Sequence, residues 1–219
     1  MRIGILGGTF NPIHMAHLRC AEEVREAQQL DRILFVPSAT PPHKRAAGLA
    51  SMAHRLAMVR LAIAGNPSFR VSTIEIDRVG RSFSVDTVRA LRARLPRARF
   101  AFIVGMDAFI EIGTWKDYRT LFGLCDLIVM SRPSVRAPRL RSALPVAARA
   151  DFCYRQTTTT LEHSTGHHIV YQQISDLDIS ASAIRERLAR GGSIRYLVPI
   201  SVERYIAQRH LYARRVAAR

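Results

Sequence analysis

Several features are scarce or absent in this 219-residue sequence. No apolar run approaches the roughly 18 residues that a membrane-spanning helix needs, and the apolar N-terminal segment is too short for a secretory signal peptide. The three cysteines, Cys20, Cys125 and Cys153, have neither the spacing of a metal site nor that of a disulfide framework. These absences argue against a membrane protein and a disulfide-stapled secreted domain. We therefore expect a cytoplasmic protein with reduced thiols.

Lysine is also scarce, although the charge is strongly positive. The sequence has 33 basic and 17 acidic residues, a formal charge of +16, and only Lys44 and Lys116 are lysines. A GC-rich genome explains much of such an arginine excess, and attraction of phosphate-rich ligands or nucleic acid is the functional alternative. The arginines form no basic run of the kind that nucleic-acid binders have. We expect a polyanionic small substrate and no nucleic acid, while a basic nucleic-acid-binding protein on a nucleotide-binding fold stays an alternative.

Apolar residues make up 48% of the chain, which is enough for one sizeable core. Strands are expected at 2–6, 32–36, 69–76, 100–104, 127–130 and 168–174, and helices at 16–29, 51–64, 86–95, 180–190 and 202–211. This alternation predicts an α/β fold, a Rossmann-like, doubly wound, mostly parallel sheet with helices on both faces. We expect a single domain over 1–219 with a peripheral, variable excursion at about 134–166. Ligands of such folds bind at the carboxyl ends of the strands.

A glycine-rich segment follows the first strand directly: Gly7, Gly8, Thr9, Phe10, Asn11 and Pro12, then His14, Ala16 and His17. It is neither a Walker loop nor a Gly-x-Gly-x-x-Gly fingerprint, which weakens ATPase and dehydrogenase interpretations. Glycines let the backbone approach a phosphate, and the helix that follows directs N–H groups toward it. Two histidines three residues apart at a helix start can present ring nitrogens to the same phosphate. The alternative is a pair that merely caps the helix.

The pattern Gly-Gly-Thr-Phe-x-Pro-x-His-x-x-His resembles the signature of the nucleotidylyltransferase superfamily. From residue 3 to about 210 the chain is similar to the bacterial nicotinate-nucleotide adenylyltransferase family, except that Asn11 replaces the usual Asp and Ala16 the usual Gly. The resemblance implies adenylyl transfer from MgATP to nicotinate mononucleotide, giving nicotinate adenine dinucleotide and pyrophosphate, in NAD biosynthesis. It also implies that His14 and His17 are catalytic and that ATP is bound by Gly7, Gly8, Thr9 and Phe10.

Two later segments complete the ATP-binding motifs that the resemblance implies. Ser182 and Arg185 are three residues apart and share one face of a helix that Ser180 can cap. Alone, this segment would favour an ordinary capped helix with a solvated arginine, but together with the first motif it favours an anion site. It resembles the family motif Ile-Ser-x-Thr/Ser-x-Ile-Arg, which implies that Ile179, Ser180 and Ser182 bind ATP and that Arg185 is catalytic. Farther upstream, Gly105 and Asp107 match a Gly-x-Asp motif whose carboxylate accepts from ribose hydroxyls.

The acceptor-binding residues are also implied by resemblance. The segment 82–87 is similar to the family's Ser-Tyr-Thr-x-Asp-Thr, so N–H groups at Ser84 and Val85 are expected to receive the nicotinate carboxylate, with Thr87 nearby. A plain helix cap is the alternative.

Two further positions belong to the same expected acceptor site. The only tryptophan, Trp115, precedes Lys116 and is expected to stack on the pyridine ring, with core packing as the alternative. Lys44 lies in Pro-Pro-His-Lys, a family loop, although a solvated loop lysine would also fit.

No carboxylate cluster suited to holding a metal is visible in the sequence, so Mg²⁺ is expected to arrive with ATP. Two acceptors of the same class stay open, the amide mononucleotide and another phosphorylated compound such as phosphopantetheine. Trp115 and the 82–87 segment favour the nicotinate ring. The sequence leaves the oligomeric state open, a homo-oligomer included.

Overall fold

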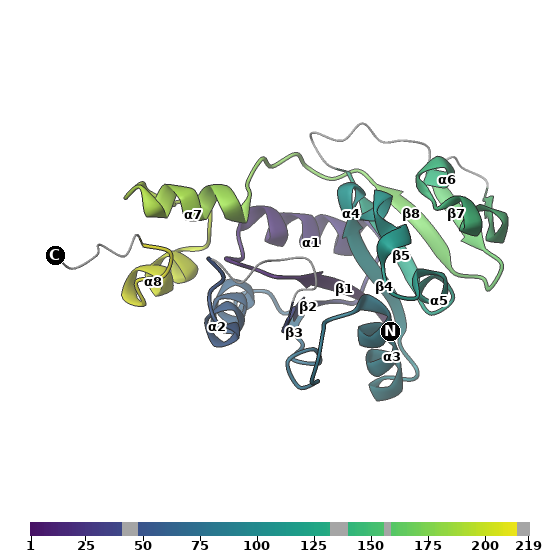
Figure 1. The fold of residues 1–219 in the computed structure, drawn as a ribbon, viewed down its shortest axis with the longest axis horizontal. Helices are drawn as coiled ribbons and strands as arrows, with labels where there is room; N and C mark the ends of the chain where they lie inside the picture. Colours follow the sequence, from purple (N-terminus) through teal and green to yellow (C-terminus); the bar gives the residue numbers. More distant parts are fainter. Residues whose placement is uncertain (41–47, 132–139, 156–158, 214–219) are drawn as a thin grey trace.

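We analysed a computed structural model that describes residues 1–40, 48–131, 140–155 and 159–213. Its framework is one eight-stranded sheet (Figure 1). The strands are β1 (Arg2–Gly8), β2 (Arg32–Pro37), β3 (Phe69–Val71), β4 (Arg99–Gly105), β5 (Asp126–Met130), β6 (Phe152–Tyr154), β7 (Thr160–His163) and β8 (His168–Gln172).

The strand order is β3-β2-β1-β4-β5-β8-β7-β6, and β7 pairs antiparallel with both of its neighbours, β8 and β6. The chain builds outward from β1 in one direction to β3, then returns to place β4 on the other side of β1. Ligands of doubly wound folds bind where the order reverses in this way. Leu6 pairs with Ile103, so Gly8 and Gly105, two residues farther on, leave the sheet at the same edge. The predicted α/β fold is confirmed.

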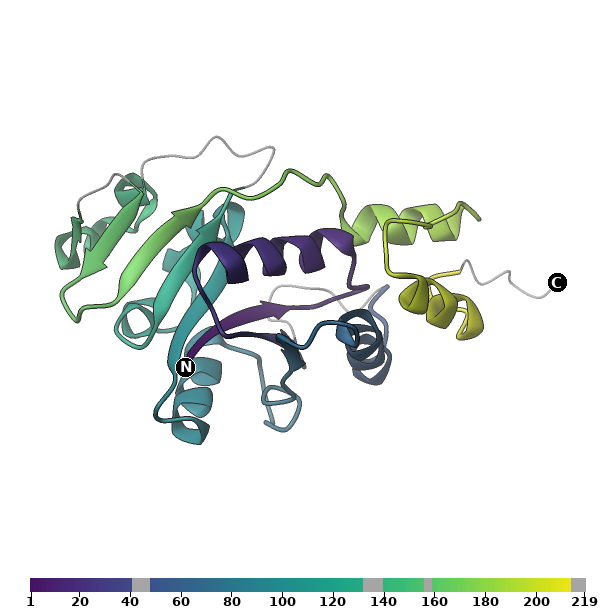
Figure 2. The ribbon, with the colours of Figure 1, turned by 180° about the vertical axis from the view of Figure 1, so that it is seen from behind.

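Helices cover both faces because the central strands alternate their side chains between two cores. In β1, Ile3 and Ile5 face one core and Leu6 faces the other. The first core is covered by α3 (Ser84–Arg94), α4 (Met106–Ile110), the 3₁₀ helix η1 (Ile112–Thr114), α5 (Tyr118–Phe122), α6 (Leu140–Ala143) and η2 (Val146–Asp151). The second is covered by α1 (Met15–Ala27), α2 (Met52–Ile63), α7 (Ala181–Ala189) and α8 (Ile200–Gln208). Figure 2 shows α1 in front of the sheet.

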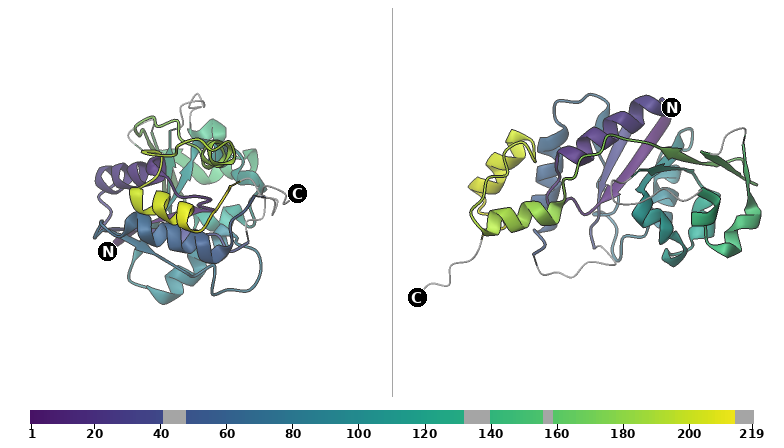
Figure 3. Two further views of the ribbon diagram at one scale, coloured as in Figure 1. Left: turned by 90° about the vertical axis from the view of Figure 1, so that its left-hand side faces the viewer. Right: turned by 90° about the horizontal axis from the view of Figure 1, so that it is seen from above.

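The C-terminal helices lie beyond the carboxyl end of β1, at the left of Figure 1. There α8 packs against α2 (Figure 3). The backbone N–H of Met15, the first residue of α1, donates to the carbonyl of Leu197 at 2.9 Å. The C-terminal segment is thereby fixed beside the start of α1. Within the described residues, the structure contains no helix whose length and apolar character would allow it to cross a membrane.

Several elements end earlier than the sequence predicts, among them the helix expected to reach residue 29, which ends at Ala27, and the strand expected to reach residue 174, which ends at Gln172. The strand expected at 69–76 stops at Val71, because the N–H groups of Ile76 and Asp77 both donate to the carbonyl of Thr73 and form a turn. The helix expected to reach residue 211 stops at Gln208. The backbone of His210 is left-handed there, with φ of 48°.

The range 134–166, expected to be a peripheral excursion, lies partly outside the described residues. Its described part includes β6 and β7, which extend the edge of the sheet beyond β8. Leu140, Leu144, Phe152 and Leu161 from this range are buried in the first core. This range therefore contributes side chains to the first core as well as two strands at the edge of the sheet.

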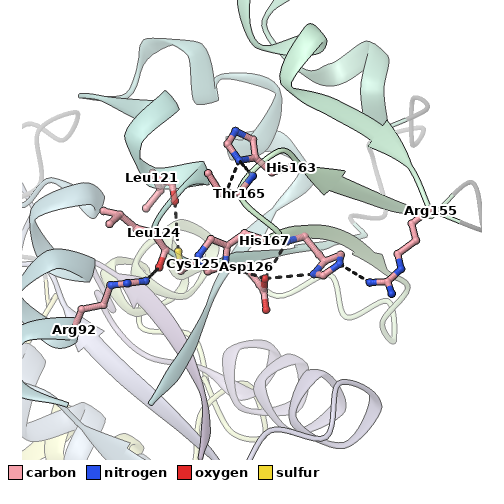
Figure 4. A network of polar contacts seen from close by, with 10 residues as sticks. Arg92, Leu121, Leu124, Cys125, Asp126, Arg155, His163, Thr165 and His167 are labelled. Atoms are coloured by element: carbon pink, nitrogen blue, oxygen red, sulfur yellow. Dashed lines mark hydrogen bonds and ion pairs between the residues drawn. The ribbon is translucent and has the colours of Figure 1, made fainter. Parts of the chain in front are cut away.

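A polar network ties the amino ends of β5 and β8 together, opposite the edge where Gly8 lies (Figure 4). The Asp126 carboxylate accepts from the His168 backbone N–H at 2.9 Å and is 3.3 Å from Nδ1 of His167. Arg155 Nη1 lies 2.9 Å from Nε2 of His168. Burial alone would raise the pKa of Asp126, but the hydrogen bonds from His167 and His168 outweigh it and the pKa is lowered.

Candidate active site

The two motif histidines lie at the start of α1, directly after the glycine-rich loop. His14 is the N-cap residue and is 5% exposed, and the ring centroids of His14 and His17 are 3.7 Å apart. The His14 backbone N–H donates to Nδ1 of His17 at 3.3 Å. Since Nδ1 accepts that bond, the neutral His17 ring carries its proton on Nε2. The histidine pair therefore caps the helix, and the same hydrogen bond also sets the tautomer of His17.

Packing beneath the loop holds the His17 ring in place. Phe10 is 2% exposed and has a left-handed backbone with φ of 48°. Its ring lies edge-on to the ring of His17 at 5.2 Å. A Cβ on Gly8 would come within 3.0–3.3 Å of the Phe10 ring, which explains the glycine there. The buried Phe10 side chain thus supports His17, so any contact of Phe10 with ATP would come from its backbone.

Arg185 reaches the same loop from α7. Its Nη1 donates to the backbone carbonyl of Asn11 at 2.8 Å. Ser180 caps α7 by accepting from the Ala183 N–H at 3.1 Å, and its hydroxyl is 3.1 Å from that of Ser182. Both serines are exposed, whereas the side chain of Ile179 packs against the second core. The structure therefore places the helix starts of α1 and α7 on either side of one loop.

A buried arginine that the sequence analysis did not single out connects this loop to its surroundings. Arg55 of α2 is 1% exposed. Its Nη1 donates to the carbonyls of Thr9 and Ser38, each at 2.8 Å, and its remaining contacts are to the carbonyls of Ala39 and Ala50, at 3.3 and 3.2 Å. Burial lowers the pKa of Arg55. One guanidinium thus ties the glycine-rich loop to both flanks of residues 41–47.

Asn11 also connects the glycine-rich loop to other segments, and the residue is 6% exposed. Its side-chain Nδ2 donates to the Gly48 carbonyl at 3.0 Å, and its Oδ1 accepts from the Ala50 N–H at 3.0 Å and from the Tyr212 hydroxyl at 2.7 Å. Tyr212 was not identified from the sequence either. The expected residue Lys44 lies outside the described residues.

The β4 end supplies the opposite side of the site. Gly105 precedes α4, and Asp107 is exposed in the first turn of that helix. Trp115 is half-buried and lies edge-on to Phe102 of β4, with ring centroids 6.0 Å apart. A Cβ on Gly7 would lie 3.7 Å from the same Phe102 ring. The ring of Phe102 therefore lies between Trp115 and the glycine-rich loop. Part of the indole packs on the core and the rest is exposed.

The segment expected to bind the acceptor begins α3. Ser84 is the first helical residue, and Phe83 caps the helix without a side-chain hydrogen bond. The first N–H groups of a helix have no partner within it, so Ser84 and Val85 offer main-chain donors. The Ser82 hydroxyl accepts from the Ala39 N–H at 3.1 Å, which connects this segment to the loop after β2.

The structure revises the expectation for Thr87. Its side chain is 1% exposed and its hydroxyl donates to the buried Glu75 carboxylate at 2.6 Å. Thr87 therefore supports the start of α3 rather than contacting a ligand. Lys116 lies 2.9 Å from the Asp86 carboxylate and 5.0 Å from the centre of the Phe83 ring. Its ammonium borders the expected acceptor site while paired with Asp86.

Over the part of the chain that the structure describes, no group of three or more histidine, cysteine, aspartate or glutamate side chains has the arrangement of a metal site.

The chain is similar to known proteins both in sequence and in fold. The cytidylyltransferase-like family model matches residues 5–187. A protein of Citrifermentans bemidjiense named "Probable nicotinate-nucleotide adenylyltransferase" is 52% identical over 97% of this chain and 98% of its own. A Geobacter sulfurreducens protein of the same name is 51% identical, over 97% and 99%.

Among solved structures, the Plasmodium falciparum nicotinic acid mononucleotide adenylyltransferase complexed with NaAD matches with a TM-score of 0.74. It is 19% identical, with 96% of this chain and 97% of that chain covered, and so shows the likeness of fold. The family match and the two relatives show the family as well as the fold. On their evidence, the chain belongs to the nicotinate-nucleotide adenylyltransferase family of nucleotidyltransferases.

Proposed function

We propose that this chain transfers the adenylyl group of MgATP to nicotinate mononucleotide at the edge where β1 and β4 end. One observation carries the assignment of the site. The histidine pair of α1 and Arg185 of α7 converge on a single loop, with Arg185 Nη1 2.8 Å from the Asn11 carbonyl. Groups from two helix starts can therefore surround one set of phosphates.

In the proposed reaction, an oxygen of the acceptor's 5′-phosphate attacks the α-phosphorus of ATP in line. A new P–O bond forms as the bond from the α-phosphorus to the bridging oxygen breaks, and its electron pair leaves on pyrophosphate. No covalent intermediate with the enzyme is needed, so the protein acts by positioning and by stabilising charge. The glycine-rich loop and the first turn of α1 receive the α-phosphate.

His17 and Arg185 have distinct tasks in this scheme. The tautomer of His17 makes Nε2 a donor, suited to the α-phosphate and the bridging oxygen as charge develops on them. Arg185 donates one N–H to the Asn11 carbonyl, and the other donors of its guanidinium can serve the departing pyrophosphate. Ser180 and Ser182 extend that anion site on the exposed start of α7. MgATP is the substrate, and the metal ion enters with its phosphates and keeps several waters.

The acceptor lies between β4 and the start of α3 in this proposal. Trp115 offers an exposed part of its indole to the pyridine ring, and the Ser84 and Val85 N–H groups receive the carboxylate. Asp107 accepts from ribose hydroxyls. These contacts favour the acid over the amide mononucleotide, because an amide NH₂ placed among N–H donors finds no acceptor.

The test is pyrophosphate release from MgATP with nicotinate mononucleotide, the amide mononucleotide and phosphopantetheine supplied in turn. We expect the highest kcat/KM with the nicotinate compound. Release with only one of the other two would reject the proposed acceptor and leave adenylyl transfer standing. A gel shift with DNA and RNA at physiological salt, if positive together with no pyrophosphate from any acceptor, would reject the enzyme in favour of a nucleic-acid binder.

A further inference from the structure

The C-terminal end of α8 reaches the glycine-rich loop through a specific turn. The Leu211 N–H donates to the Ile206 carbonyl, and the His210 N–H donates to the Ala207 carbonyl. The backbone of His210 has the left-handed conformation. This bond pattern is a Schellman motif, which ends a helix and reverses the chain. Leu211 and Tyr212 then pack against the second core. The turn delivers the Tyr212 hydroxyl to Asn11 at 2.7 Å.

The Asn11 side chain needs an amide to make its three contacts. Its Oδ1 accepts from Tyr212 and Ala50, while its Nδ2 donates to the Gly48 carbonyl. A carboxylate could accept the first two bonds but would turn an oxygen toward the Gly48 oxygen. This explains why asparagine is suited to this position in this chain, where the resembling family usually has Asp.

The Asn11 carbonyl accepts from Arg185, so the residue that Tyr212 fixes also holds the guanidinium. Burial raises the pKa of Tyr212, against the opposing effects of Arg185 and Arg55. The hydroxyl therefore keeps its proton and remains a donor. A continuous chain of hydrogen bonds runs from Tyr212 through one residue to the proposed phosphate-binding arginine.

We propose that Tyr212 is a positioning residue for adenylyl transfer, which acts through Asn11 to hold Arg185 and the 48–50 segment at the phosphate site. The inference rests on the proposed function, in particular on the role of Arg185. It assigns the C-terminal turn a part in the reaction rather than in packing alone.

Tyr212→Phe removes one oxygen and leaves the ring in the core. We expect kcat to fall by about three- to tenfold, the equivalent of one buried hydrogen bond, with little change in KM for nicotinate mononucleotide. Tyr205→Phe is the matched control, because Tyr205 lies in α8 and its hydroxyl is bonded to His54 rather than to Asn11, at 2.9 Å. We expect Tyr205→Phe to change thermal stability to a similar extent and to leave kcat unchanged.

The deciding comparison repeats Tyr212→Phe in an Arg185→Ala background, assayed at raised enzyme concentration to follow the slow turnover. Because Tyr212 holds Arg185 as well as the 48–50 segment, kcat should fall by less there than in the wild-type background, although the Tm should decrease to the same extent. An equal loss of kcat in both backgrounds, or none in either, would overturn the proposal. Asn11→Asp, which keeps the Tyr212 bond, should weaken turnover by disturbing Gly48 and serves as the second variant. Wild-type protein that releases no pyrophosphate would instead reject the proposed function.

Discussion

Replacing Arg55 by methionine should weaken both the fold and the reaction, because one buried side chain bonds four carbonyls around the site. Methionine replaces the aliphatic stem of the side chain and removes every donor. The bonds to Thr9 and Ser38, at 2.8 Å, are the strong ones, and those to Ala39 and Ala50 are longer. Hydrogen bonds to charged groups contribute about 1.5–3 kcal/mol each, so the two strong bonds together account for roughly 3–6 kcal/mol.

Part of that loss is offset, because the charge no longer has to be buried. The lowered pKa of Arg55, caused by burial, shows that the folded protein bears such a cost. We therefore expect a net loss of about 3 kcal/mol in the free energy of unfolding. For a chain of this size that corresponds to a fall in Tm of roughly 6–12 °C. Turnover should fall by about tenfold or more, measured well below the Tm, because the glycine-rich loop loses its tie to Ser38 and Ala50.

Thermal unfolding by circular dichroism and pyrophosphate release measure the two effects separately. Arg60→Met is the matched control, since Arg60 lies on the exposed face of the same helix, α2. Its stability should change by no more than about 0.5 kcal/mol. Arg55→Lys should fall between wild type and Arg55→Met, because an ammonium keeps the charge but cannot reach four carbonyls with a planar fork. Wild-type stability and turnover in Arg55→Met would show that these contacts do not order the site.

Periodicity and turn residues were sufficient to predict the central fold. The run of apolar residues that precedes Gly7 and Gly8 is a buried strand, as predicted, and α2 begins after Ser51, whose hydroxyl accepts from the His54 N–H. The doubly wound, mostly parallel sheet was predicted from the alternation of strands and helices alone. These features depend on residues close together in the sequence, which is why local patterns identify them.

Arg55 could not be identified in the same way, because its partners come from segments 5 to 46 residues distant. The sequence did contain a weak signal. Arg55 is spaced four residues before Val59 and eight before Ile63, on the buried stripe of α2. In a chain with 31 arginines, one arginine on an apolar stripe does not stand out. The burial of Tyr212 depends likewise on a left-handed turn at His210, a residue type that gives no such indication.

The edge strands were missed for a related reason. β6 and β7 contain three and four residues, too few to show a period, and residues 156–158 between them lie outside the described part. The pairing of Phe152 with His163 and of Tyr154 with Leu161 sets the register that places Phe152 and Leu161 in the first core. A pairing of that kind is long-range information that propensity does not contain.

The remaining predictions concern the phosphate contact, the acid range and the acceptor. His17→Ala should lower kcat by about 10²–10³ with little change in KM for ATP, because the proposed contact of His17 with the phosphate strengthens mainly in the transition state. Steady-state kinetics with MgATP measure both constants, and near-normal turnover would contradict the prediction. Asp126→Asn should reduce stability by about 1 kcal/mol at neutral pH and flatten the loss on acidification. The pKa of Asp126 is lowered in the folded state, so the carboxylate stabilises the fold above its unfolded pKa and this stabilisation disappears as the pH falls through the folded pKa. Urea unfolding from pH 7 to pH 3 measures the free energy of unfolding of both proteins. Parallel pH dependences for wild type and Asp126→Asn would reject this prediction. Lastly, nicotinate mononucleotide should be preferred over its amide by roughly 5- to 150-fold in kcat/KM, because in the proposed site its carboxylate would pair with the N–H groups at Ser84 and Val85, whereas an amide would leave about 1–3 kcal/mol of pairing unmet. Trp115→Ala should raise KM for both compounds alike, since stacking on the ring does not depend on the carboxyl group. Long-range attraction to the arginine-rich surface adds to the acid's advantage only at low salt. The preference is therefore measured at both low and high ionic strength, and equal use of the two compounds at high salt would show that no main-chain carboxylate site operates at the start of α3.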